Sequence, residues 1–151
     1  MSKIKREKND GTDPKKDDGN DKTIMATDRV CRMRVTNQLS QAISNVALTH
    51  SSGDTNTVIN VATLNSNDSS PEKQISFETG FWADFDYWNV SFNIGGQVYN
   101  TPWNDRCNIS YEDAGGLIDC QIQEDSHYGG DHNLHVGMPK SSSCNFNVSK
   151  N

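Results

Sequence analysis

The stretch TGFWADFDYWNVSFNIGGQVYNTPW, residues 79–103, decides the fold. Its apolar side chains recur at every second position from Trp88 to Ile94, with small polar residues between them. This period of two predicts a half-buried β-strand, because successive side chains of a strand point to opposite faces. Gly95 and Gly96 then predict a two-residue hairpin turn, since the turns that suit a hairpin need positive φ.

The same alternation extends to both sides of this stretch. Strand-like segments cover residues 31–35, 43–50, 57–64 and 73–79 before it, and residues 107–110, 117–123, 133–138 and 144–149 after it. Residues 111–116, YEDAGG, predict a tight corner or a single helical turn. No amphipathic helix is evident. The pattern predicts an all-β protein, an antiparallel β-sandwich of about 8–10 short strands. A barrel or a jelly roll is the alternative.

The N-terminal residues have a different composition. Apart from the initiator, residues 1–24 contain two aliphatic side chains, Ile4 and Ile24, among many Lys, Asp, Asn, Gly and Thr residues. Such a segment cannot bury enough apolar surface to offset the entropy lost on ordering. We therefore predict a disordered charged tail over residues 1–27 and a β-sandwich domain over residues 28–151.

Charge limits the partners that this domain can bind. The formal net charge of the chain is −6, and the tail nearly cancels its own charges. From Val35 onward four basic residues face thirteen Asp and Glu residues, which argues against nucleic-acid binding. The sequence has neither an apolar signal-peptide core nor a window of transmembrane length. We expect a soluble protein, either cytoplasmic or secreted by a non-classical route.

The four cysteines are Cys31, Cys107, Cys120 and Cys144. None of them forms a C-x-x-C pair, which argues against a zinc site. Without an export signal we expect reduced thiols. If the compartment is oxidising, the first pairing to expect is Cys107 with Cys120, although three connectivities are open to two disulfides.

The order of several short motifs resembles the up-regulated in Daf-two domain family over residues 33–101. In that family a strand ending in Asn precedes an sNV strand followed by His, matched here by Asn37, residues 44–46 and His50. A TGF motif and an Asp-aromatic-Trp strand come next, matched by residues 79–81 and 86–88, with Tyr87 where the family has a first Trp. The resemblance implies a small β-sandwich and supplies no catalytic residue. A looser likeness to aegerolysin-type sandwiches implies binding at a lipid surface.

Aromatic residues form the first candidate site. Trp88 and Phe92 share one face of a strand, so we expect them in the core. Loop aromatics just before this strand can either cover the core or anchor a lipid or sugar. Asp84 and Asp86 beside them would repel an anionic membrane. The predicted ligand-binding residues are Trp82, Phe85, Tyr87 and Trp103.

The loop QEDSHYGGDHNLH, residues 123–135, is the second candidate site. It contains metal-competent side chains on a glycine-bearing segment. Its spacing matches neither the HExxH helix nor the EF-hand loop, so an ordinary solvated loop is the alternative, and we expect no cofactor. The predicted metal ligands are His127, Asp131, His132 and His135.

Catalytic motifs are missing from the sequence. There is no GxSxG elbow and no phosphate-binding lysine after the glycines, although Arg106 could lower the pKa of Cys107. We expect a non-enzymatic binding module that recognises a membrane lipid, a glycan or another cell-surface component through loop aromatics. One alternative is a protein-interaction or toxin-associated, immunity-like subunit that uses an acidic sheet edge. A secreted hydrolase is the third hypothesis, and the oligomeric state stays open.

Overall fold

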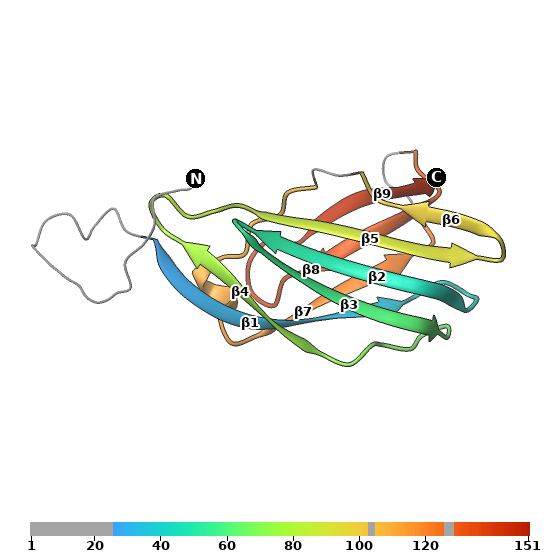
Figure 1. Cartoon of the computed structure of the whole chain (residues 1–151), viewed down its shortest axis with the longest axis horizontal. Coiled ribbons are helices and arrows are strands. Elements are labelled where there is room, and N and C mark those ends of the chain that lie inside the picture. Colours follow the sequence, from blue (N-terminus) through green and yellow to red (C-terminus); the bar gives the residue numbers. More distant parts are fainter. Residues whose placement is uncertain (1–25, 103–104, 126–128) are drawn as a thin grey trace, which may run out of the picture.

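The computed structural model describes residues 26–102, 105–125 and 129–151 (Figure 1). These residues form nine strands and one short 3₁₀ helix, η2 (Tyr111–Asp113). The predicted all-β class is confirmed. The predicted tail falls on residues 1–25, which lie outside the described residues, and on residues 26 and 27. The strands are β1 (Thr27–Asn37), β2 (Ile43–Ser52), β3 (Thr55–Leu64), β4 (Lys73–Thr79), β5 (Asp86–Ile94), β6 (Gln97–Asn100), β7 (Leu117–Gln123), β8 (His132–Gly137) and β9 (Cys144–Lys150).

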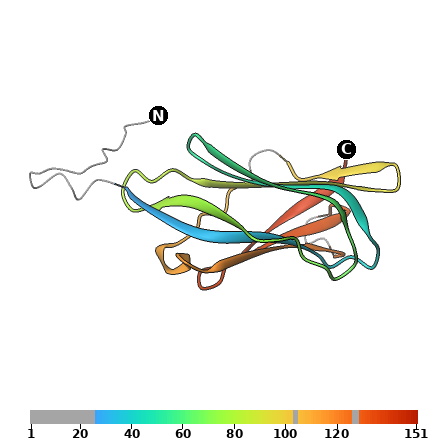
Figure 2. The same cartoon turned by 60° about the horizontal axis from the view of Figure 1, so that its bottom comes forward.

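The strands follow the order β3-β2-β5-β6-β9-β8-β7-β1-β4. The first four form one layer and the other five form a second layer, and Figure 2 shows the layers facing each other. β6 and β9 join the layers through two residue pairs, Tyr99 with Lys150 and Asn100 with Ser149. All neighbours are antiparallel except β1 and β7, which run parallel. The predicted sandwich is therefore confirmed, with one parallel pair that alternation did not predict.

The inward faces of both layers fill one core. Trp88 and Phe92 of β5 are completely buried, as predicted, and so are Met33 and Val35 of β1. Asn89 and Ser91, which alternate with Trp88, Val90 and Phe92 on β5, are half-buried and point to the outer face. The alternation in the sequence thus identified the core side of the strand correctly.

One predicted strand is wrong. Residues 107–110 belong to no strand, and the nearby Arg106 forms a single isolated bridge with Tyr87. Trp88 N donates to Asp105 O, and Cys107 N donates to Asp86 O, so this segment runs along β5 beyond the end of β6. Its apolar residues alternate because they are buried, but the buried carboxylate of Asp86 takes the place of a strand partner and accepts from Ile109 N.

The predicted corner at residues 111–116 is confirmed, and a buried carboxylate organises it. Asp113 accepts hydrogen bonds from the backbone of Ser110, Lys140 and Ser141 and from the Ser141 hydroxyl. Burial raises the pKa of Asp113, but the bonds from Ser141, Ser110 and Lys140 outweigh it and hold this pKa below its usual value. Asp113 therefore ties η2 to the loop between β8 and β9.

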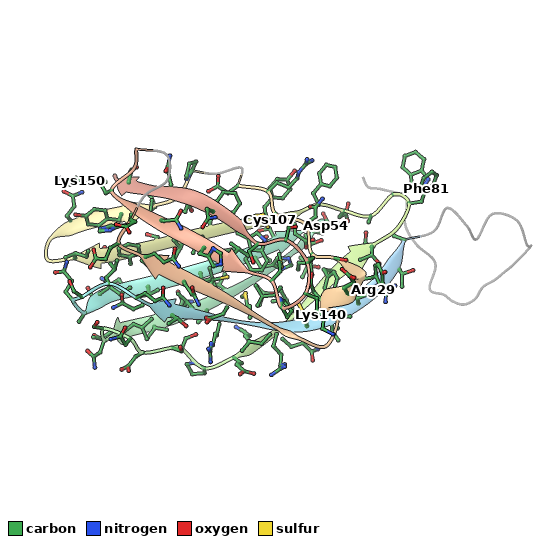
Figure 3. The ribbon with its side chains drawn as sticks, turned by 180° about the vertical axis from the view of Figure 1, so that it is seen from behind. Arg29, Asp54, Phe81, Cys107, Lys140 and Lys150 are labelled. Carbon is green, nitrogen blue, oxygen red and sulfur yellow. A yellow bond between two sulfur atoms is a disulfide. The ribbon has the colours of Figure 1, made fainter. Side chains whose placement is uncertain are left out.

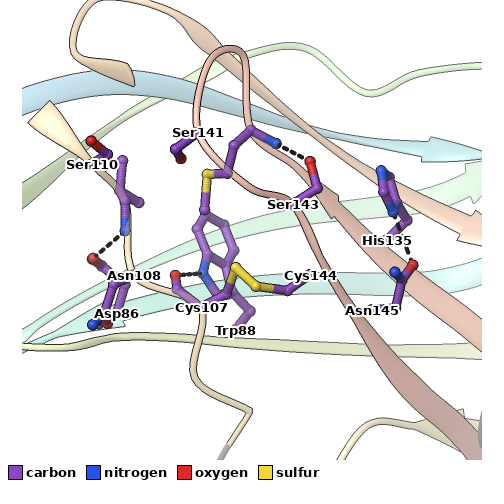
Figure 4. Close-up of a disulfide and its surroundings, with 12 residues drawn as sticks. Asp86, Trp88, Cys107, Asn108, Ser110, His135, Ser141, Ser143, Cys144 and Asn145 are labelled. Atoms are coloured by element: carbon purple, nitrogen blue, oxygen red, sulfur yellow. Dashed lines mark hydrogen bonds between the residues drawn. A yellow bond between two sulfur atoms is a disulfide. The ribbon is translucent and has the colours of Figure 1, made fainter. Parts of the chain in front are cut away.

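The cysteine prediction is corrected. Cys107 is bonded to Cys144, across 37 residues of sequence, while Cys31 and Cys120 are free and buried. The expected Cys107–Cys120 pair is therefore wrong, and the expected reduced state is confirmed for Cys31 and Cys120 but wrong for Cys107 and Cys144. The reason is topological, because Cys120 points into the core from the middle of β7, whereas Cys144 begins β9 beside the segment that carries Cys107 (Figure 4).

Candidate functional site

A four-residue turn, residues 80–83, carries two exposed aromatic side chains, one of which, Trp82, is the most exposed aromatic side chain of the described residues. We call it the aromatic turn. It follows β4, and Ala83 N donates back to Gly80 O across it at 3.2 Å. Phe81 is 64% exposed and Trp82 is 75% exposed, with their rings packed edge to face at 6.1 Å. Figure 3 shows Phe81 at the far end of the molecule, pointing away from the sheets.

The backbone of the aromatic turn is held in an unfavourable conformation. Trp82 has φ of 66°, in the left-handed region that glycine and asparagine adopt most readily. A residue held in such a region costs about 1–3 kcal/mol, and such strain clusters at binding and catalytic sites. The strain here keeps a large ring in water, where it gains nothing from the core of this chain.

The aromatic turn is braced from behind by two contacts of Asp84. Asp84 N donates to the carboxylate of Glu78 at 2.9 Å. The Asp84 carboxylate lies so close to Gly53 that a Cβ on this glycine would be 2.3 Å from Asp84 Oδ2. Gly53 also has φ of 58° in the tight turn between β2 and β3. The turn is therefore fixed against a neighbouring hairpin, which lowers the entropy lost when it binds a partner.

Two arginines contact further aromatic rings at this end of the sandwich. Arg106 lies over the ring of Phe85, 4.3 Å from its centroid. Arg29 donates to the hydroxyl of Thr79 and lies 5.9 Å from the centroid of Tyr111. Each arginine is thus partly engaged with a ring of this chain. The rings of Phe81 and Trp82 have no such cation partner among the described residues.

Charged groups of both signs lie around this end. Arg29 and Arg106 share it with four carboxylates that lie on β1, on the β2–β3 turn, behind the aromatic turn and on η2, and the exposed Arg32 and Lys140 lie beside η2. The carboxylates of Asp54 and Asp84, next to the aromatic turn, repel anionic partners. The four carboxylates are those of Asp28, Asp54, Asp84 and Glu112.

Two of the four predicted ligand-binding residues lie on the aromatic turn or next to it. Trp82 is exposed, and Phe85 is 46% exposed. Tyr87 is half-buried on the outer face of β5, beside Arg106, and so lies further back. Trp103 lies outside the described residues. Phe81 belongs to the same aromatic cluster of the sequence but was not among the predicted ligand-binding residues, although it is adjacent to Trp82, and Arg29 and Tyr111 were not predicted.

The predicted metal ligands are not gathered in the described part of the chain. His132 and His135 are three residues apart on β8 and so point to opposite faces. His132 packs against the ring of Tyr99 at 5.1 Å, and Asp131 accepts from Lys150 N. Among the described residues no group of three or more His, Cys, Asp or Glu side chains could hold a metal ion. His127 lies outside them, so the full set stays a prediction.

A buried His–Asp pair is the other notable polar cluster. His50 Nε2 lies 2.7 Å from Asp86 Oδ1, and both side chains are buried from solvent. Asp86 also accepts from Ile109 N, and its own N donates to Asn108 Oδ1. Figure 4 shows this region beside the disulfide, where Trp88 Nε1 donates to the Cys107 carbonyl. The pair fixes the segment around residue 107 against β5 and offers no exposed nucleophile.

The remaining thiols are not poised to react. Burial, with smaller contributions from Asp86 and Asp113, raises the pKa of Cys31 to about 12. Burial likewise raises the pKa of Cys120 well above its usual value. Since the thiolate is the reactive form, both cysteines are inert in the folded state. Cys107, considered above as a thiol next to Arg106, is bonded to Cys144.

Comparison with known proteins adds no relative. No family model matches the chain, and no curated protein matches it. The resemblance to the up-regulated in Daf-two domain family therefore stays a prediction. The described residues contain no helix with the length and apolarity that a membrane span requires.

Proposed function

We propose that this chain is a binding module that docks on a zwitterionic lipid surface by inserting the aromatic turn. The observation that carries the proposal is Trp82, which is 75% exposed and held at a left-handed φ beside the exposed Phe81. A large ring kept in water at a conformational cost is better explained by an external partner than by the stability of the chain.

The shape of the turn favours a lipid over a glycan. Phe81 projects outward at the end of the molecule (Figure 3), and its ring meets that of Trp82 at an interplanar angle of 72°. Two rings at this angle offer no continuous flat platform for a sugar. Tryptophan and phenylalanine on a projecting turn suit the boundary between lipid headgroups and acyl chains, where an amphipathic ring satisfies both environments.

The charge around the turn favours a lipid with no net charge. Asp84 lies directly behind the inserted rings, and Asp54 follows Gly53, which the Asp84 carboxylate contacts. An anionic leaflet would repel this end, because each charge near such a surface is worth about 1 kcal/mol. A choline headgroup carries a cation that can lie over an aromatic face.

The expected affinity is modest. Burying an aromatic side chain contributes about 1.5–3 kcal/mol, so two rings contribute about 3–6 kcal/mol and give weak, reversible binding with a dissociation constant between about 40 μM and about 6 mM. This range suits a module that samples a surface or acts through several copies. It also means that losing one ring should be measurable.

Binding to vesicles tests the proposal. We expect the full chain to sediment with phosphatidylcholine vesicles, and brominated phosphatidylcholine to quench tryptophan fluorescence. Phe81→Ala together with Trp82→Ala should weaken sedimentation by about tenfold or more. Tyr111→Ala removes an equally exposed ring from η2, outside the inserted turn, and should retain binding.

Two outcomes would contradict the proposal. One is sedimentation that does not change in the double variant. The other is binding to glycans that depends on Trp82, without binding to phosphatidylcholine. Vesicles that contain phosphatidylserine should bind more weakly than phosphatidylcholine alone, and the reverse would show that the carboxylates do not govern selectivity.

A further inference from the structure

The two edge strands of the sandwich, β3 and β4, differ in how they are protected against pairing with another chain. β4 has seven residues, begins at Lys73 and follows Pro71, and these are features that blunt an edge. β3 has ten residues, TNTVINVATL, with no charged side chain and no proline. Among the described strands β3 pairs with β2 alone. A long, uncharged edge of this kind is a template for another strand.

The register of the β2–β3 hairpin shows which backbone groups of β3 point away from β2. Ser52 pairs with Thr55 across the two-residue turn, so the N–H and C=O groups of Thr55, Thr57 and Ile59 point toward β2. Those of the residues between them point outward. Lys73 Nζ donates to Val58 O at 2.9 Å, which agrees with this assignment. The outward residues are Asn56, Val58, Asn60 and Ala62.

We propose that β3 pairs antiparallel with β3 of a second copy of this chain, centred on Ile59. In this register Val58 lies opposite Asn60 of the other copy, and Asn56 lies opposite its Ala62, so every outward backbone group from Asn56 to Ala62 has a partner. The pairing extends the β3-β2-β5-β6 layer into one continuous sheet across both copies.

The absence of charged side chains from β3 is the reason that we choose a second copy of this chain as the strand that pairs with it. The chain has a formal net charge of −6, so most of its faces repel each other in a self-complex. β3 is a face where two copies meet with no charged side chain opposite another, since all its side chains are neutral. A strongly charged partner strand would gain no complementary charge from β3.

Lys73 controls access to this edge. Its ammonium group donates a hydrogen bond to Val58 O, and a partner strand needs that carbonyl as an acceptor. Lys73 therefore competes with association, and removing it should favour pairing. Lysine on or beside an edge is one of the ways in which natural sheets limit association.

Analytical ultracentrifugation of the full chain tests the proposal. Over a range of about 10 μM to about 1 mM we expect a reversible monomer–dimer equilibrium. Asn60→Pro removes an outward N–H that the hairpin does not use, and should weaken dimerisation by about tenfold or more. Asn60→Thr keeps that N–H and serves as the matched control, with dimerisation unchanged. Lys73→Met should strengthen the dimer.

If Asn60→Pro disturbs folding, a pair of oppositely charged substitutions at Asn60 tests the same dimer. Asn60→Lys and Asn60→Glu each place two like charges across the proposed axis, and each variant alone should be monomeric. An equal mixture of the two should form a mixed dimer again. A chain that stays monomeric over the whole range overturns the proposal, and so does a dimer that ignores substitution of Asn60. Neither result bears on vesicle binding, because the aromatic turn lies outside β3.

Discussion

At the scale of single residues, Trp82 is the position where the backbone conformation suits the side chain least. Left-handed turn positions favour glycine or asparagine, yet this one carries a bulky aromatic side chain. Trp88, six residues later, shows the opposite case, because it is completely buried and hydrogen-bonded through its indole N–H. The two tryptophans differ in role because one lies on a strand facing the core and the other on a turn facing water.

Replacing Trp82 should therefore separate stability from binding. Trp82→Asn places a residue that tolerates positive φ in the turn, and we expect the free energy of unfolding to rise by about 1 kcal/mol. The same variant should lose sedimentation with phosphatidylcholine vesicles. Denaturant unfolding, followed by far-ultraviolet circular dichroism, measures the first effect. A drop in stability would show that Trp82 serves the fold, and Trp82→Phe is the control that keeps both the ring and the strain.

At the scale of elements, connections between strands depend on buried polar groups as much as on apolar packing. Asp113 holds η2 against the β8–β9 loop, and Asp86 holds the segment around residue 107 against β5. In both cases a carboxylate accepts backbone N–H groups that no strand partner satisfies. Such irregular segments are therefore ordered without a ladder of hydrogen bonds.

The depressed pKa of Asp113 predicts how stability changes in acid. Its contribution is fully present above the pKa of an unfolded aspartate, about 4, and is lost as pH falls through the lower folded value. Asp113→Asn should lower the free energy of unfolding at pH 7 by about 2–4 kcal/mol, because an amide leaves some of the buried donors unpaired. The difference in free energy of unfolding between wild type and variant should become smaller below about pH 4.

Denaturant unfolding at a series of pH values measures this gap. The difference between the two curves isolates Asp113, since the other titrating groups are present in both proteins. One of these is Asp105, whose pKa burial raises to about 6 and whose contribution therefore runs the other way, being lost as pH rises through that value. If the difference in free energy of unfolding is the same at pH 2 and pH 7, the ionised Asp113 does not stabilise the fold as we describe.

At the scale of the whole molecule, the disulfide links the two layers. Cys107 belongs to the segment along β5, in the first layer, and Cys144 begins β9 in the second. Among the described strands, the two residue pairs of β6 and β9 are the only strand pairing between the layers. Such a bond persists only where the surroundings are oxidising enough to keep the two thiols from being reduced.

Removing this bond should weaken the whole domain. A double substitution, Cys107→Ala with Cys144→Ala, should lower the free energy of unfolding by about 2–4 kcal/mol, because the unfolded chain regains the freedom of a closed loop. Thermal and denaturant unfolding measure the loss, and Cys31→Ser serves as a control that leaves the bond intact. Thiol titration under non-reducing conditions should detect two free thiols per chain after unfolding. Finding four would show that the bond does not form.

The sequence by itself determined nine strands, their inward faces and the tight turns, because each of these follows from neighbouring residues and a period of two, and its one wrong strand, residues 107–110, is a buried segment with the same alternation. Trp88 and Phe92 in the core, the turn at Gly95 and Gly96, and the corner at residues 111–116 were all predicted on this basis. Periodicity gives the face of a strand but carries no information about which strand lies next to it.

Only the tertiary structure decided the strand order, the parallel pairing of β1 with β7, and the partner of Cys107. It also showed that the acidic sheet edge considered from the sequence is absent from β3, and that β4 holds one carboxylate, which is nearly buried. The exposure of Trp82 belongs to this group as well. Each of these depends on residues far apart in the chain, whose contacts form only when the two layers pack together.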